Sequence, residues 1–162
     1  VHCTLLNRLF EESMMINILV MLHVLAVVIW VGGMLFAHMQ LRPVAADQLD
    51  PPVRLKLWVG VFGRFFPWVW ASILVILVTG FWIISIYGGF KGLGMHINIM
   101  MTLGIIMMFI FFHVFFAPYK RLKLAVAAED WPTAGAKLAQ IRKLIGINML
   151  LGVLTVAIRY VL

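Results

Sequence analysis

The chain has 162 residues, of which 64% are hydrophobic and only 12% are charged, and its mean hydropathy is +1.07. Soluble domains carry about 25% charged residues, so this composition excludes a water-soluble globular protein and indicates an integral membrane protein embedded in a lipid bilayer. The net charge of +7 does not indicate a nucleic-acid partner. The basic residues lie mostly between the apolar segments, where they report membrane topology.

The first thirteen residues, VHCTLLNRLFEES, differ in composition from the apolar run that Met14 opens. We therefore expect residues 1–13 to be a non-native or disordered leader and residues 14–162 to form one four-helix transmembrane domain. The apolar run is longer than the hydrophobic region of a cleaved signal peptide, which favours a retained helix. The single cysteine, Cys3, excludes an internal disulfide, and the CxxCH signature of covalent haem attachment does not occur.

Four apolar runs are long enough to cross a bilayer, which takes about 20 residues. The predicted spans are residues 15–40, 65–88, 95–117 and 144–162. The expected fold class is therefore an all-α integral membrane four-helix bundle.

Basic residues are concentrated in the first and third connections, residues 42–64 and 120–143, whereas the middle connection has only Lys91. By the positive-inside rule the two basic connections are cytoplasmic. Both termini then face outward, and the first and third spans run in the same direction. We expect a multi-pass protein of the bacterial inner membrane.

The two basic connections also contain apolar residues, which favours helices lying along the membrane interface. We expect residues 55–63 to lie there, before Pro67. In the third connection, part of the chain should extend the third span and the rest should form an interfacial helix. The break is expected at Trp131-Pro132, with Asp130 or Thr133 as a cap.

Four histidines lie in two of the spans, His23 and His38 in the first, His96 and His113 in the third. A titratable ring in lipid is costly and usually functional. The separations of 15 and 17 residues correspond to about 22 and 25 Å along a helix. Because the two spans are parallel, this predicts an outer pair, His23/His96, and an inner pair, His38/His113. The facing angles do not place all four on one stripe.

Two axial imidazoles give a low-spin b-type haem suited to electron transfer. We therefore predict haem b between the first and third spans, with two haems favoured and one as the alternative, passing electrons to quinone or a redox protein. Propionates need cations, and the inner end supplies Arg42, Arg64, Lys120 and Arg121. The sequence leaves open whether the protein is a membrane oxidoreductase and whether it forms a homodimer.

Eleven methionines open a second interpretation, because thioether together with imidazole suits copper(I). A copper-handling or copper-transport membrane protein is therefore the alternative, although methionine is also an ordinary apolar filler. Asn98 and Asn148 are expected to hydrogen-bond between helices.

The segment LHVLAVVIWVGGMLFAHMQLRP resembles the opening of small bacterial proteins of the copper-resistance D (CopD) family, and HVFFAPYKRLKLAVAAEDWPTAGAKLAQIRKLIGIN is similar to their second half. The family name implies copper, and its buried histidines suit haem equally well. More distantly, the chain resembles HemJ-type protoporphyrinogen oxidases, four-helix haem-b membrane proteins whose histidines match His23 and His96. Where that family has a lysine, this chain has Asn98. The resemblance thus implies haem ligation at the two histidines, with a porphyrinogen-oxidase-like enzyme as a second alternative.

Overall fold

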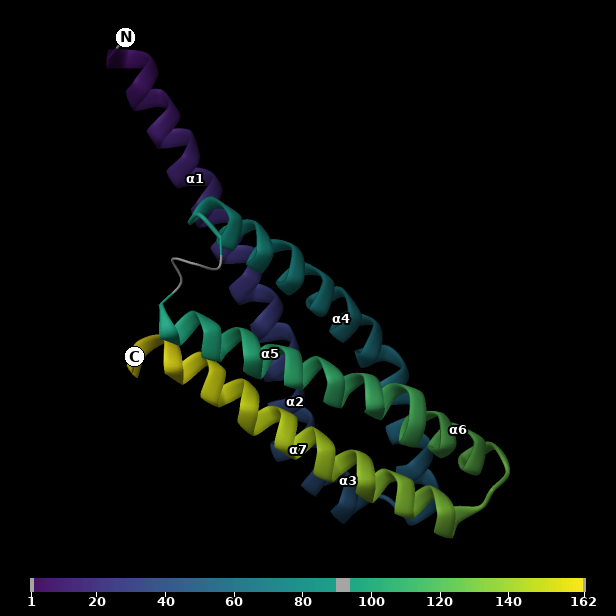
Figure 1. The fold of residues 1–162 in the computed structure, drawn as a ribbon. Helices are drawn as coiled ribbons and strands as arrows, with labels where there is room; N and C mark the ends of the chain where they lie inside the picture. The colour runs from purple at the N-terminus through teal and green to yellow at the C-terminus, as the bar shows by residue number, and fades with distance from the viewer. Residues whose placement is uncertain (1, 90–93, 162) are drawn as a thin grey trace.

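The computed structural model describes residues 2–89 and 94–161, with side chains for 10–89, 94–158 and 161. Its ribbon consists of helices joined by short connections (Figure 1). Within these residues, four helical runs are long and apolar enough to cross a membrane: Phe10–Gln48, Pro51–Ile86, Met95–Ala127 and Trp131–Ile158. The predicted all-α, four-span architecture is confirmed. Which connections face the cytoplasm stays a prediction.

Two of the four runs are single α-helices and two are interrupted by π-helical turns. The first run is α1 (His2–Val27), η1 (Val28–Gly32), α2 (Gly33–Phe36), η2 (Ala37–Leu41) and α3 (Arg42–Gln48). The second is α4 (Pro51–Ile86). The third is α5 (Met95–Val114), η4 (Phe115–Tyr119) and α6 (Lys120–Ala127), and the fourth is α7 (Trp131–Val161).

Proline explains two of the wider turns. A proline ring clashes with the carbonyl four residues earlier and has no N–H to donate, so the preceding helical turn must widen. Pro43 is the second residue after η2, and Pro118 lies inside η4. His38 lies within η2, and His113 comes two residues before η4, so both predicted inner histidines sit at these irregular turns.

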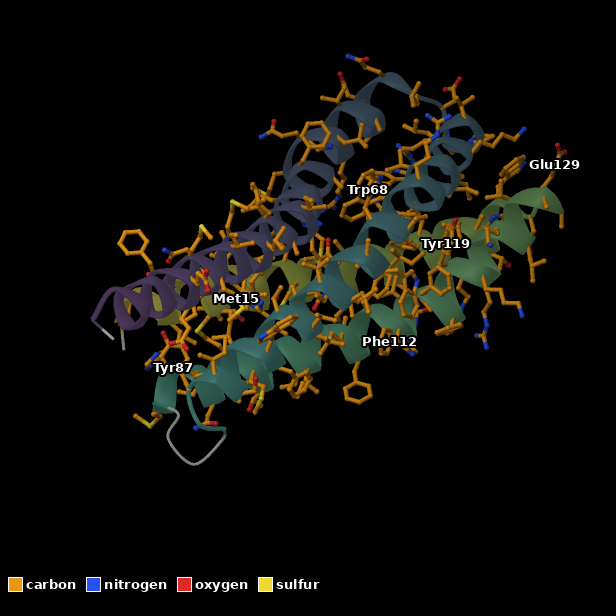
Figure 2. The ribbon with its side chains drawn as sticks, turned by 90° about the horizontal axis from the view of Figure 1, so that it is seen from above. Met15, Trp68, Tyr87, Phe112, Tyr119 and Glu129 are labelled. Atoms are coloured by element: carbon orange, nitrogen blue, oxygen red, sulfur yellow. The ribbon has the colours of Figure 1, made fainter. Side chains whose placement is uncertain are left out.

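The runs alternate in direction, and α1 and α5 point the same way, as predicted (Figure 1). α1 packs chiefly along α4, and α5 packs chiefly along α7. The N-terminal part of α1 projects beyond the other helices (Figure 1). Tyr87 and Glu129 mark opposite ends of the bundle (Figure 2).

Two predictions about the basic connections are wrong. Residues 55–63 do not lie along the interface, because α4 runs unbroken through Pro67 and buries Leu55, Trp58 and Phe62 in the bundle. The third connection contains no separate interfacial helix, since α7 is continuous from Trp131. Its stripe of Ala134, Leu138 and Ile141 is buried, and this part of α7 packs on α6, which explains the continuity. α6 does extend the third span, as expected.

An aromatic cluster fills the centre of the bundle. Phe66 of α4 lies 4.8 to 5.9 Å, between ring centres, from Phe62, Phe111, Phe115 and Tyr119. Trp70 continues the cluster onto Phe111 and Phe112 of α5. These contacts fix how α4 sits against α5 and η4, and Trp30 of η1 joins the same cluster through Phe111.

Asp130 is confirmed as the cap of α7: its Oδ1 accepts a hydrogen bond from the Thr133 backbone N–H at 3.1 Å. Hydrogen bonds from the side chain and then the backbone of Thr133 hold the pKa of this carboxyl below its usual value. A lowered folded-state pKa means that the stabilisation is present above the unfolded-state pKa and is lost as the pH falls through the folded-state value.

We therefore expect Asp130→Ala to lower the melting temperature in detergent at neutral pH, and the difference from the wild type to vanish in acid. Asp130→Asn keeps a capping oxygen without a titrating group. It should stay near the wild type at neutral pH and show no acid-dependent loss at this position. Equal pH profiles for all three proteins would contradict the assignment.

Candidate functional site

His23 is the histidine that the structure holds most specifically. Its ring lies against α4, where a Cβ added to Gly80 would be 3.4 Å from His23 Cε1. His23 Nδ1 is 2.8 Å from Thr79 Oγ1. The Thr79 hydroxyl has one proton, which it donates to the Val75 carbonyl at 2.6 Å. The hydroxyl must then accept from His23 Nδ1–H, which leaves the lone pair on Nε2.

His38 lies at the contact between η2 and α7, away from α4. Its ring packs on α7, where a Cβ added to Gly146 would be 3.3 Å from His38 Cε1. One turn earlier, Met34 Sδ accepts a hydrogen bond from Asn148 Nδ2 of α7 at 3.8 Å, which confirms the prediction that Asn148 bonds between helices. The positive charges of Arg42 and Arg142 act on His38. A cation bound at this imidazole would be repelled by both guanidinium groups.

The two histidines of α5 are placed differently from the other two. His96 is half-buried, and its ring folds back over Gly94, whose added Cβ would lie 2.8 Å from His96 Cε1. His113 is exposed on α5.

This arrangement does not bring the members of the predicted histidine pairs, His23/His96 and His38/His113, into contact. Among the residues with described side chains, no hydrogen bond or ring contact joins His23 to His96 or His38 to His113. In the same set, no three His, Cys, Asp or Glu side chains converge on a point that could hold a metal ion. The structure packs α1 chiefly on α4 and α5 chiefly on α7, and the first and third runs meet through rings such as Trp30 and Phe111, 6.2 Å apart between ring centres, rather than through the histidines.

The cations predicted for haem propionates do not form one group. Arg64, Lys120 and Arg121 are exposed, and the described interactions do not link them. Arg42 instead lies near Arg142 and Arg54: His38, one turn before Arg42, packs on Gly146 of α7, one turn after Arg142, and Arg54 bonds the Ala46 carbonyl of α3. Sequence reasoning missed Arg54 and Arg142 as partners of Arg42, since they come from different connections.

Two hollows in the described part of the structure bear on the predicted cofactor. A cavity of about 20 Å³ lies at the centre of the bundle, and its lining includes Trp30, Met34, Phe66, Phe111 and Asn148. Cofactor sites usually enclose about 300–1,000 Å³. A larger hollow of about 370 Å³ lies on the projecting part of α1 and is lined by residues of that helix alone, Phe10 to Met21. Neither hollow lies between two histidines, so the described residues do not fit the predicted haem.

Thr79 and Gly80 were not predicted as site residues. A threonine inside an apolar span usually bonds its own helix, as Thr79 does to Val75, and the sequence carries no sign that its lone pair serves a histidine of another helix. The glycine next to Thr79, Gly80, was the one feature of the sequence that could have indicated this contact, because a glycine lets a ring approach the helix closely.

Comparison with protein families gives one finding. A family model described as copper resistance protein D matches residues 59–162, which is more than half of the chain. The match starts within α4 and includes Thr79 and all of α5, α6 and α7, but not α1. No curated protein and no solved structure matches the chain.

Proposed function

The chain belongs to the copper resistance protein D (CopD) family, and on this premise we propose that it handles copper within the membrane, with copper(I) as its cargo. His23 Nε2 is the ligand that we assign first. The observation that supports this assignment is the Thr79 hydroxyl, which fixes the ring with its Nε2 lone pair available. Metal-binding histidines almost always donate their other ring N–H to such an acceptor.

Charge favours His23 over His38. The guanidinium groups of Arg42 and Arg142 act on His38, whereas His23 lies against an uncharged stretch of α4 around Thr79 and Gly80. The free energy of a positive ion rises when it is brought close to like charges in a medium of low dielectric constant. We therefore place copper at the His23 level of the bundle and give His38 a packing role against α7.

The second ligand in this proposal is His96. It lies in the first turn of α5, which starts at the end of the bundle where α4 finishes, and α4 holds His23 near that same end. Methionines near the start of α5 (Met95, Met100 and Met101) add thioethers, the other donor that suits copper(I). We place the protein in the bacterial inner membrane, with its two basic connections on the cytoplasmic side, on the strength of the charge pattern.

The test is the metal and haem content of the same purified sample. After expression with added copper under reducing conditions, we expect about one copper per chain, by elemental analysis, and no Soret band. A Soret band confirmed by pyridine haemochrome, in protein without copper, would overturn the proposal and favour the b-type haem interpretation. Protein with neither group after reconstitution with both would also overturn it and favour structural histidines.

A further inference from the structure

A group of three arginines lies at the end of the bundle near His38, and the copper proposal does not use it. Arg42 opens α3, Arg54 lies in the first turn of α4, and Arg142 lies in α7. His38, one turn before Arg42, packs on Gly146 of α7, where an added Cβ would be 3.3 Å from His38 Cε1, and Arg142 lies one turn before Gly146. Arg54 bonds the Ala46 carbonyl of α3, so it lies beside the helix that Arg42 opens. Three separate elements therefore bring their positive charges to one place.

Two of these guanidinium groups are positioned by backbone carbonyls. Arg54 Nη1 donates to the Ala46 carbonyl of α3 at 3.2 Å, and Arg142 Nε donates to the Leu138 carbonyl at 3.4 Å. Both residues are half-buried, while Arg42 is exposed. A guanidinium has five N–H donors, so each anchored group keeps four for another partner.

The side chains that the structure describes supply no paired counter-charge to this group. Among the residues whose side chains are described, no Arg or Lys forms an ion pair with Asp or Glu. Asp47 and Asp50 lie in the same connection but are exposed and make no such pair. Like charges held together on half-buried side chains are unfavourable unless an anion joins them, and the planar guanidinium fork matches a phosphate bidentately.

We propose that Arg42, Arg54 and Arg142 form a binding site for the phosphate group of an anionic phospholipid. The position supports a lipid, because Arg42 follows the first predicted span and Arg142 directly precedes the fourth, the depth at which headgroups lie. Basic pockets between membrane helices commonly take anionic headgroups. The half-buried guanidiniums of α4 and α7 hold the phosphate from the bundle side, and Arg42 closes it from the exposed side.

The experiment measures lipid retention by native mass spectrometry of the purified full chain. The protein is equilibrated with equal amounts of phosphatidylglycerol and phosphatidylcholine, and inorganic phosphate alone is a separate arm. We expect the wild type to retain phosphatidylglycerol preferentially. The double variant Arg42→Gln/Arg142→Gln should reduce that preference about tenfold or more. Arg42→Lys/Arg142→Lys, which keeps the charge but loses the fork, should fall between them.

The control is Lys120→Gln/Lys143→Gln, which removes the same charge from exposed positions and should retain the wild-type preference. Melting temperatures of all variants, measured in the same detergent, show that they are folded, and Arg54→Gln gives a second reading if the first double variant does not fold. Equal losses in the arginine and lysine variants would overturn the site. Retention of inorganic phosphate without a preference for phosphatidylglycerol would overturn the assignment to a lipid.

Discussion

Replacing His23 with alanine is expected to remove the copper that the wild-type protein carries, whereas His113→Ala should leave it bound. The two changes delete the same side chain from the first and third runs. His23 is held by Thr79 with its Nε2 lone pair available, and His113 is exposed on α5. Elemental analysis of both purified variants is the measurement, and equal copper in the two would contradict the assignment of His23.

Variants of Thr79 test the assignment of His23 more specifically, because Thr79 would act on the metal only through its hydrogen bond to His23. Thr79→Val keeps the size of the side chain but removes the acceptor for His23 Nδ1–H, and loss of such a partner typically weakens metal affinity about 10–100-fold. Thr79→Ser restores the hydroxyl and should restore most of the affinity. Competition with a copper(I) chelator measures all three proteins. If valine and serine gave the same constant, the hydrogen bond would have no part in binding.

The spans could be predicted from the sequence because each is a long apolar run with at most one charged residue, and the polar connections bound it. Which helices lie side by side could not be predicted in this way. The four histidines predicted a close contact of the first and third spans at the histidines, but the structure packs α1 chiefly on α4 and joins the first and third runs through Trp30 and Phe111. This packing depends on how aromatic side chains of α4, such as Phe66 and Trp70, meet α5, and no periodicity in the sequence reports it.

The effect of each proline on its helix could not be predicted from the sequence either. A proline inside the helix ends or kinks many soluble helices. α4 nevertheless continues through Pro67, and neighbouring helices in membranes often compensate for the lost hydrogen bond. Pro43 and Pro118, by contrast, are accompanied by the π-helical turns η2 and η4. The basic residues behave similarly: their number in each connection predicted topology, but only the packing of η2 on α7 and of α3 on α4 brings Arg142 and Arg54 near Arg42.

Phe66→Ala is expected to destabilise the bundle by on the order of 3 kcal/mol. The side chain is 2% exposed and contacts four aromatic rings from α4, α5 and η4. Lipid is as apolar as the core, so burial itself contributes little between membrane helices, and close packing supplies most of the stabilisation. Removing the ring therefore acts through the cavity it leaves and the lost edge contacts, which hold α4 against α5.

Phe109→Ala is the matched control, because this phenylalanine of α5 is 67% exposed and its ring contacts only Phe112 among the described rings, at 6.4 Å. Lipid fills the space that its truncation leaves, so no cavity forms and the stability should stay close to that of the wild type. Unfolding of both variants in mixed micelles with increasing denaturing detergent measures the difference. Equal destabilisation would mean that the central aromatic cluster does not determine how α4 packs, and the position of Thr79 beside His23 would then need another cause.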